Sequence, residues 1–463
     1  MVEKVETLLQ WLRQSPEFKL NQHITVEDTE DSGRGVYLST GKIGPNVPLI
    51  SIPSCFQLNT LTVRYHLHLF NRNIKASGEE RHFPYLEEIK ENDPRKVAYG
   101  LLDDEYIRSL TSFQLISLYI LAEWFLLPAW SNNNQSFKSF WKPFFDCWPT
   151  DDELALIPTK WYFSKDDQIR DLIKYLPRSS QKHVQRISDL IQNDWNVIEP
   201  IINKWIELIE NDYWNTFSLD NLFHLFIRVY FTINSRCLYA EIPDKKDDIA
   251  SRFTLVPYVD YLNHTTDVDV HCYPRINYNK QDYCGVGQFT IYSGTYRYQT
   301  VGEELYLNYG AHSNDFLFNE YGFQVPQNPW NHMDISTEVC DVLARSQETV
   351  EFLKNMDYWG DYSVSYENVS YRLTVALSHF TSKDDRRVQK LMEGFITEDF
   401  FSTKNNVILR DILTQKKLKI ESELANLDTN INKLQEKLLY VRNIRALHND
   451  ELQIINSILI SLQ

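Results

Sequence analysis

The chain has 463 residues, 43% of them hydrophobic and 14% aromatic, so it can bury the cores of several domains. This composition excludes a wholly disordered or fibrous protein. The formal net charge of -16 argues against a protein that binds nucleic acid through a basic surface, because neutralising phosphates requires clustered Lys and Arg. An acidic protein suits a basic partner better.

The first residues of the chain predict an amphipathic helix. Val5, Leu8, Leu9 and Leu12 recur at helical spacing, and charged residues lie between them. A signal peptide has a different pattern, so secretion is not expected. The six cysteines are far apart and include no C-x-x-C pair, which favours reduced, intracellular thiols over a zinc ribbon or a disulfide scaffold.

Short strands are predicted between Gly33 and Pro53, in the segments GVYLST and PLISIP, because β-branched residues are bounded there by Gly and Pro. Helical periodicity follows from about Leu61 to Arg228. Within it, residues 110–130 are nearly long enough to span a bilayer, but an acidic residue near the middle disfavours insertion. We expect a buried core helix there.

Strand patterns return between Phe253 and Tyr309, and helical patterns resume after Pro329. The order is strands, then helices, then strands, which indicates a β domain interrupted by a helical insertion. Near the end of the chain, apolar residues recur at alternating intervals of three and four. This seam predicts either a long helix packed on its own domain or a short coiled coil that recruits a partner. Its members are Leu424, Leu427, Ile431, Leu434, Leu438 and Val441.

Three short clusters contain residues suited to chemistry. In residues 32–36, two glycines precede a strand, so a ligand can lie against the main chain. Residues 260–264 end with Asn and His, which offer donors and acceptors on short side chains. Residues 302–310 contain Gly-Glu-Glu and Tyr-Gly, and a second Tyr-Gly pair follows within residues 321–323. Taken singly, each cluster fits a turn or a core, and none has the spacing of metal ligands, so no metal is expected.

Taken together, the order and spacing of the clusters resemble the SET-domain methyltransferases. The closer resemblance is to the branch typified by the Rubisco large-subunit lysine methyltransferase, which in fungi includes enzymes acting on ribosomal proteins and translation factors. Asn234-Ser235-Arg236 and Ser313-Asn314 fit the same order. The segment from Ser139 to Phe144, SFWKPF, is similar to the S-x-W-x-P-Y element of that branch's insertion. The resemblance covers about residues 5–330, and the rest is placed by analogy.

The resemblance implies an α+β fold, in which a β-rich SET domain is interrupted by a helical insertion and followed by an all-helical C-terminal domain. The expected boundaries place the two parts of the SET domain at residues 1–60 and 229–328. The helical insertion spans residues 61–228, and a helical domain like the family's substrate-binding domain spans residues 329–463.

The resemblance also implies S-adenosyl-L-methionine as the cofactor. Tyr309 matches the family's active-site tyrosine and also lies at the cofactor, while Asp260 and Tyr273 fall where the family lines its substrate channel. Ser32 stands where many relatives have Glu before the first glycine, and Asn308 precedes Tyr309 where relatives vary; neither departure argues against methyl transfer. The other residues expected at the cofactor are Ser32, Gly33 and Arg34 through their main chain, Arg236 at its carboxylate or at the neighbouring substrate, Asn263 and His264 at its amino and adenosyl portions, and Gly322 and Phe323 near the adenine.

The implied activity is methylation of a lysine on a non-histone protein, such as a basic ribosomal protein or translation factor. Two alternatives stay open, a protein-histidine methyltransferase of the same branch and a catalytically inactive SET module that only binds proteins. We expect a monomer in the cytoplasm or the nucleus, with no direct contact to nucleic acid or membrane. The number of methyl groups transferred does not follow from the sequence.

Overall fold

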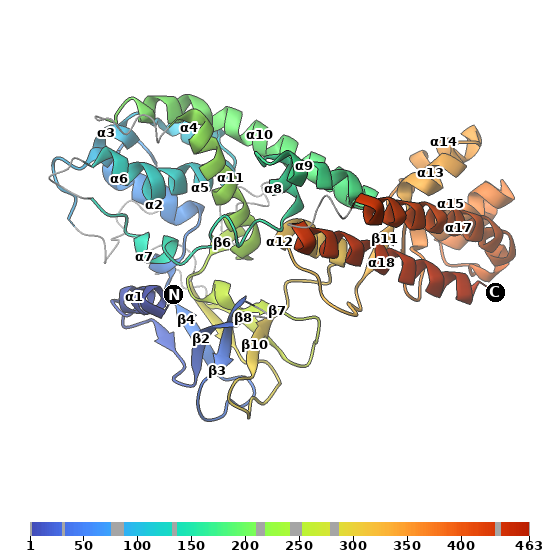
Figure 1. Ribbon diagram of the computed structural model, residues 1–463, viewed down its shortest axis with the longest axis horizontal. Coiled ribbons are helices and arrows are strands. Elements are labelled where there is room, and N and C mark those ends of the chain that lie inside the picture. Colours follow the sequence, from blue (N-terminus) through green and yellow to red (C-terminus); the bar gives the residue numbers. More distant parts are fainter. Residues whose placement is uncertain are drawn as a thin grey trace. The chain divides into compact units, whose positions relative to one another are not determined.

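The computed structural model describes residues 2–29, 33–75, 88–131, 137–209, 218–240, 252–277, 287–430 and 437–462. Packing divides the chain into two compact units (Figure 1). The first contains Met1–Leu154 and Ile187–Gly310, and the second contains Ala155–Arg186 and Ala311–Gln463. These two units are defined by packing contacts and not by family domains. The domain boundaries predicted at 60/61, 228/229 and 328/329 therefore stay predictions.

A mixed sheet forms the β part of the first unit. Its strands lie in the order β1-β4-β9-β8-β10-β3-β2, and β7 also pairs with β10. The predicted strands GVYLST (residues 35–40) and PLISIP (residues 48–53) correspond to β3 and β4, so both strands are confirmed; β3 begins two residues earlier than predicted, at Gly33. The bounds are β1 Lys19–Leu20, β2 Ile24–Thr29, β3 Gly33–Leu38, β4 Pro48–Ile52, β7 Asn263–His264, β8 His271–Asn277, β9 Gln288–Tyr292 and β10 Glu304–Leu307, with β5 Cys237–Tyr239 and β6 Phe253–Leu255 forming a separate pair.

Strand β10 lies between two strands that are neighbours in the sequence. Tyr306 of β10 pairs with Asn263 of β7 and also with His271 of β8, both in the parallel direction. Because a strand has two hydrogen-bonding edges, β7 and β8 must occupy opposite edges of β10. The chain that follows β10 therefore starts beside Asn263 and His264.

The first unit also contains helices: α1 lies beside the strands, and α2 to α6 gather at the end away from them (Figure 1). Their bounds are α1 Val2–Leu12, α2 Thr60–Phe70, α3 Pro94–Gly100, α4 Asp104–Ser109, α5 Ser112–Leu121, α6 Leu127–Trp130, α7 Lys142–Phe145 and α11 Leu219–Arg236, with short turns of helix at Ser54–Phe56 and Val259–Tyr261. Helix α10, Arg178–Ile206, runs from the second unit into the first.

The apolar stretch predicted as a core helix is confirmed as one. In the part of the chain that the structure describes, Ser112–Trp130 is the helical stretch long and apolar enough to cross a membrane, and 72% of its most apolar window is buried inside the protein. A π-helical turn at Ala122–Leu126 joins α5 to α6 and contains the buried Glu123. The Tyr99 hydroxyl donates to the Glu123 carboxylate at 2.5 Å, and Arg95 lies 3.5 Å from its other oxygen. Glu123, the acidic residue that disfavours membrane insertion, therefore interacts with buried polar partners inside the protein.

The second unit is mainly helical. Its bounds are α8 Pro158–Tyr162, α9 Asp167–Asp171, a 3-10 turn at Leu172–Tyr175, α12 Asn314–Tyr321, α13 Ser336–Leu343, α14 Gln347–Asn355, α15 Tyr371–Ser382, α16 Asp385–Met392, α17 Asp399–Asn430 and α18 Leu438–Ser461, with a strand pair formed by β11 His332–Asp334 and β12 Ser363–Ser365.

Of the heptad-like residues, Leu424 and Leu427 fall on α17, and Leu438 and Val441 fall on α18; these two helices pack side by side (Figure 1). Leu427 and Val441 are buried in one hydrophobic core of the second unit. Ile431 and Leu434 lie outside the described residues. Leu427 and Val441 thus pack within their own unit, as the first of the two interpretations expected, whereas Leu438 is 58% exposed.

Candidate active site

Pairing between β10 and β7 brings Asn263 and His264 close to Tyr309, which follows β10 in the chain. Leu307, two residues before Tyr309, pairs with His264. The Tyr309 backbone N–H donates to Nδ1 of His264 at 3.1 Å, and the two rings lie 5.1 Å apart. Nδ1 of His264 is therefore the acceptor that the Tyr309 N–H meets. Two of the predicted clusters, 45 residues apart in the sequence, are thus joined directly.

The Asn263 side chain joins the glycine cluster to the same place. Its amide nitrogen donates to the main-chain carbonyl of Arg34 at 3.0 Å and to the Glu304 carboxylate at 2.7 Å. Gly33 begins β3 at φ +67°, a left-handed conformation that favours glycine. The main chain of Arg34 therefore lies beside Asn263, and the binding of cofactor by these residues stays a prediction. Ser32 lies outside the described residues.

The Arg34 side chain points away from this main-chain contact and is only 6% exposed. Its guanidinium donates to the carbonyl of Cys147 and to the carboxylate of Glu153, both at 3.1 Å. These bonds attach β3 to the segment after α7. They leave the Arg34 main chain, and not its side chain, facing Asn263.

Arg236, which is partly exposed, and the buried Asp260 side chain form an ion pair beside these residues. Nη1 of Arg236 donates to the Asp260 carbonyl at 2.9 Å and to its carboxylate at 3.1 Å, and the carboxylate side chain is 1% exposed. Burial raises the pKa of Asp260, and the adjacent Arg236 guanidinium opposes that rise. Nε of Arg236 and Oδ1 of Asp260 are buried and have no hydrogen-bond partner in the described parts of the chain. A donor and an acceptor are therefore available at one place for a charged ligand.

Backbone strain accompanies this turn. Tyr258, immediately before the helical turn that holds Asp260, has φ +68°, a conformation rare for a bulky side chain. Its ring is 1% exposed and contacts the Tyr261 ring edge-on at 5.8 Å. Strain of this kind costs on the order of 1–3 kcal/mol and persists where surrounding packing fixes it. The packed rings thus fix the path of the chain from Asp260 to His264.

Tyr309 has a buried hydroxyl with a defined partner. The phenol donates to the main-chain carbonyl of Leu262 at 2.8 Å. Burial raises the pKa of Tyr309 to about 12, while Arg236 acts to lower it. At neutral pH the phenol is therefore a hydrogen-bond donor and not a base. This supports a positioning role for the tyrosine.

Tyr273 lies on β8, on the other edge of β10. Its ring stacks on Tyr292 at 5.6 Å, and its hydroxyl donates to the Asn46 side chain at 3.1 Å. These contacts fix the ring, and its place in a lysine channel stays a prediction.

Gly322 and Phe323 belong to the second unit. Gly322 ends α12 with φ +83°, and the Phe323 ring lies 5.9 Å from that of Tyr321. Their expected position near the adenine stays a prediction. The nearby Ser313 caps α12 through its side chain.

Sequence reasoning missed two groups at this site. One is the Leu262 carbonyl, which accepts the hydrogen bond from the Tyr309 hydroxyl. This is a main-chain group in a tertiary contact, which a pattern of side chains does not predict. The other is Glu304, which stood in the Gly-Glu-Glu cluster without a role. Glu304 and Tyr306 are two residues apart on β10, so they share one face of the strand, and this spacing could have indicated their contact.

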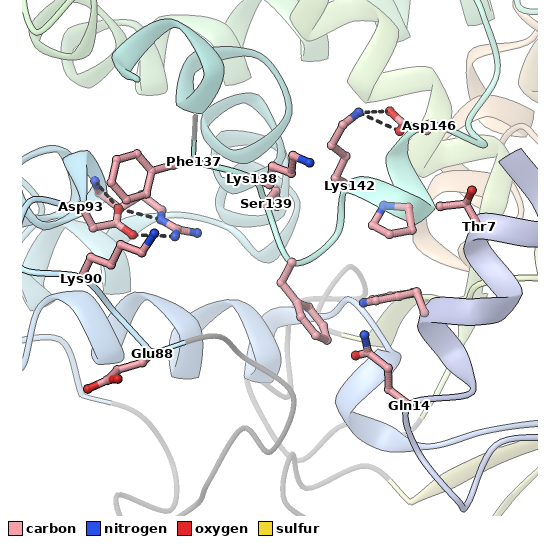
Figure 2. A pocket seen from close by; sticks show the side chains of 14 residues that line it. Thr7, Gln14, Glu88, Lys90, Asp93, Phe137, Lys138, Ser139, Lys142 and Asp146 are labelled. Atoms are coloured by element: carbon pink, nitrogen blue, oxygen red, sulfur yellow. Dashed lines mark hydrogen bonds and ion pairs between the residues drawn. The ribbon is translucent and has the colours of Figure 1, made fainter. Parts of the chain in front are cut away.

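A separate cavity of about 570 Å³ lies among the helices of the first unit (Figure 2). None of the residues predicted for cofactor or lysine lines it. Ser139, Lys142 and Pro143 of the SFWKPF element do, whereas the Trp141 indole of that element is buried and donates to the Tyr119 hydroxyl at 2.8 Å. Figure 2 shows the Lys142 amine directed to Asp146. This element therefore builds the insertion and does not take part in the cluster around Tyr309.

Comparison with known proteins gives consistent results. The family model of the ribosomal lysine N-methyltransferase 2 C-terminal domain matches residues 331–461. Ribosomal lysine N-methyltransferase 2 of Saccharomyces cerevisiae is 41% identical over 483 residues, which cover 100% of both chains. Ribosomal lysine N-methyltransferase set11 of Schizosaccharomyces pombe is 30% identical over 177 residues, covering 36% of this chain and 42% of the relative.

Among solved structures, the SET domain of LSMT bound to lysine and AdoHcy has a TM-score of 0.59, covering 100% of this chain and 91% of the other at 14% identity. This likeness concerns the fold. The predicted SET fold with a helical C-terminal part, the lysine methyltransferase class and the methyl donor S-adenosylmethionine are confirmed. On its full-length identity to a curated relative, the chain belongs to the ribosomal lysine N-methyltransferase family.

Proposed function

We propose that this enzyme transfers a methyl group from S-adenosylmethionine to a lysine side chain of a ribosomal protein. The name of its full-length relative supports the substrate class. The observation that carries the proposal is the convergence of Asn263, His264 and Tyr309 beside the ion pair of Arg236 and Asp260. A ribosomal protein is favoured over a translation factor because two relatives are named for ribosomal lysines.

The residues at this site fit the charged end of the cofactor. S-adenosylmethionine carries a carboxylate, an ammonium and a sulfonium whose methyl group is electrophilic. The buried Nε of Arg236 is a donor suited to a carboxylate, and the buried Oδ1 of Asp260 is an acceptor suited to an ammonium, either of the cofactor or of the lysine. Asn263 holds the main chain of Arg34, along which the cofactor would lie.

The acceptor lysine must lose a proton before it can attack. With a pKa near 10.4, removing that proton at pH 7 costs about 4–5 kcal/mol. Transfer into a buried site lowers the lysine pKa, because the ammonium loses its water. The proton then leaves through water, since burial holds the pKa of Tyr309 at about 12.

Most of the rate enhancement then comes from alignment. Displacement at a sulfonium methyl group requires the nucleophile, carbon and sulfur to be held in line, which a fixed site achieves by removing translational and rotational freedom. Tyr309 is fixed at both ends, by its N–H on His264 and by its hydroxyl on Leu262. We assign it to positioning the reacting groups.

The net charge of the enzyme supports a basic substrate. At -16, the protein attracts cationic partners over distances of about a Debye length, roughly 8–10 Å at physiological salt. This attraction speeds encounter and does not choose the lysine. We further propose that the enzyme acts as a monomer in the cytoplasm or nucleus, to be tested by light scattering of the purified protein and by imaging a tagged chain expressed at its natural level.

The activity is tested with purified enzyme, labelled S-adenosylmethionine and ribosomal proteins from cells that lack the enzyme. We expect label in one or a few ribosomal proteins, and mass spectrometry of the digested product should place it on lysine. Tyr309→Phe is the control for contaminating activity. Label on histidine, or no label in any ribosomal protein while another basic protein is methylated, would contradict the proposal.

A further inference from the structure

Glu304 has two contacts that bear on the cofactor pocket. One carboxylate oxygen accepts from the Asn263 amide at 2.7 Å, and the other accepts from the Tyr306 hydroxyl at 2.9 Å. Tyr306 lies two residues along the same strand, so it holds the carboxylate from the same face of the sheet. Both oxygens of the carboxylate are therefore fixed.

The Asn263 amide is fixed in turn. Its nitrogen donates to Glu304 and to the Arg34 carbonyl, two acceptors on different strands. If the amide rotated by half a turn, its oxygen would face both acceptors and repel them. Glu304 therefore determines which way the Asn263 side chain points and keeps it on β3.

The packing around Gly35 shows how closely this arrangement is built. A Cβ atom at Gly35 would lie 2.4 Å from Oε1 of Glu304 and 3.1 Å from the Asn263 amide nitrogen. Real Cβ atoms essentially never approach another atom to 2.4 Å, so the carboxylate takes the space that a side chain would need. The absence of a side chain at Gly35 therefore has a reason within the protein, the position of the Glu304 carboxylate, in addition to any need to make room for a ligand.

We propose that Glu304 is a positioning residue for the cofactor, acting through Asn263 on the main chain of Arg34. This inference rests on the proposed function, since it assigns a role within the same site. It predicts that loss of the Glu304 acceptor weakens cofactor binding and leaves the binding of the protein substrate unchanged. It also predicts that an uncharged acceptor of the same shape restores binding.

The test measures the Kd of S-adenosylmethionine and of S-adenosylhomocysteine by calorimetric titration of the full-length protein. Glu304→Ala should raise both constants about 10- to 100-fold, the size of one hydrogen bond to a charged group. Glu304→Gln keeps an oxygen toward Asn263 and should stay within about threefold of the natural protein. Tyr306→Phe, which loosens the carboxylate, should fall between them.

Glu303→Ala is the matched control. Glu303 is the neighbouring acid of the same Gly-Glu-Glu cluster, and its carboxylate accepts from the Gln299 N–H at an exposed position. Its removal should leave both Kd values unchanged. In steady-state kinetics, Glu304→Ala should raise the KM for S-adenosylmethionine and not the KM for the ribosomal protein.

Equal weakening by Glu304→Ala and Glu304→Gln would overturn the assignment, as would an unchanged Kd in Glu304→Ala. If Glu304→Ala fails to fold, Glu304→Gln and Tyr306→Phe still decide it, because the proposal requires Tyr306→Phe to bind more weakly than Glu304→Gln. A natural protein that binds neither S-adenosyl compound would refute the proposed function itself, which distinguishes the two failures.

Discussion

Replacing Tyr309 by Phe removes one hydroxyl from the centre of the site. The change deletes the hydrogen bond from the phenol to the Leu262 carbonyl, while the backbone bond to His264 is kept. Losing one such bond costs about 0.5–1.5 kcal/mol of stability, a small part of the 5–15 kcal/mol typical of a folded protein. The variant should therefore fold.

The effect on catalysis should be much larger. Removing one donor that is fixed near the reacting atoms typically lowers kcat by about 100- to 1,000-fold, or about 3–4 kcal/mol in the barrier. We expect a loss of this size in Tyr309→Phe, with an unchanged Kd for S-adenosylmethionine within about threefold. The assay is transfer of labelled methyl groups to ribosomal protein under single-turnover conditions, with thermal unfolding as the check on folding.

The pH dependence separates positioning from proton abstraction. With the pKa of Tyr309 at about 12, roughly one phenol in 100,000 is ionised at pH 7. The rate should rise between pH 7 and 9 because the substrate lysine loses its proton. The natural enzyme and Tyr309→Phe should give parallel profiles displaced by the loss in kcat. Turnover within about threefold of the natural enzyme would refute the reasoning, and so would a variant profile that lost its rise with pH.

Other changes test the rest of the structure. Asp260→Asn removes the buried charge that pairs with Arg236, so it should lower the melting temperature and reduce methyl transfer at least tenfold; an active, fully stable variant would exclude Asp260 from the site. Burial raises the pKa of Glu451 in the second unit to about 8, from an ordinary value of 4.5. The folded state then binds more protons than the unfolded state between these pH values, so stability should fall as pH rises from about 4.5 to about 8. Glu451→Gln should raise the melting temperature at pH 8.5 and not at pH 4.5, and equal shifts at both would contradict this. Glu123→Ala leaves its buried partners without an acid and should destabilise the protein by about 3–5 kcal/mol in denaturant titration, with the cofactor Kd unchanged. A weakened Kd in a folded Glu123→Ala protein would mean that the insertion acts on the site.

Local patterns in the sequence were enough to place many of the elements. The strands in GVYLST and PLISIP and the core helix within residues 112–130 follow from side-chain periodicity and from Gly and Pro at their ends, which act over a few residues. The clusters at 33–35, 260–264 and 302–310 were also visible, because unusual residues stand close together in each.

The sequence by itself determined which residue types are available for methyl transfer and the order in which they occur along the chain. Only the tertiary structure decided how they meet. Arg34 and Asn263 are 229 residues apart, and their contact exists because β10 pairs with β3 and β7 in one register. A shift of one residue in that register would turn Glu304 and Tyr306 to the opposite face of the sheet. The roles of Glu304 and of the Leu262 carbonyl therefore depend on strand pairing between distant segments, which no local pattern specifies.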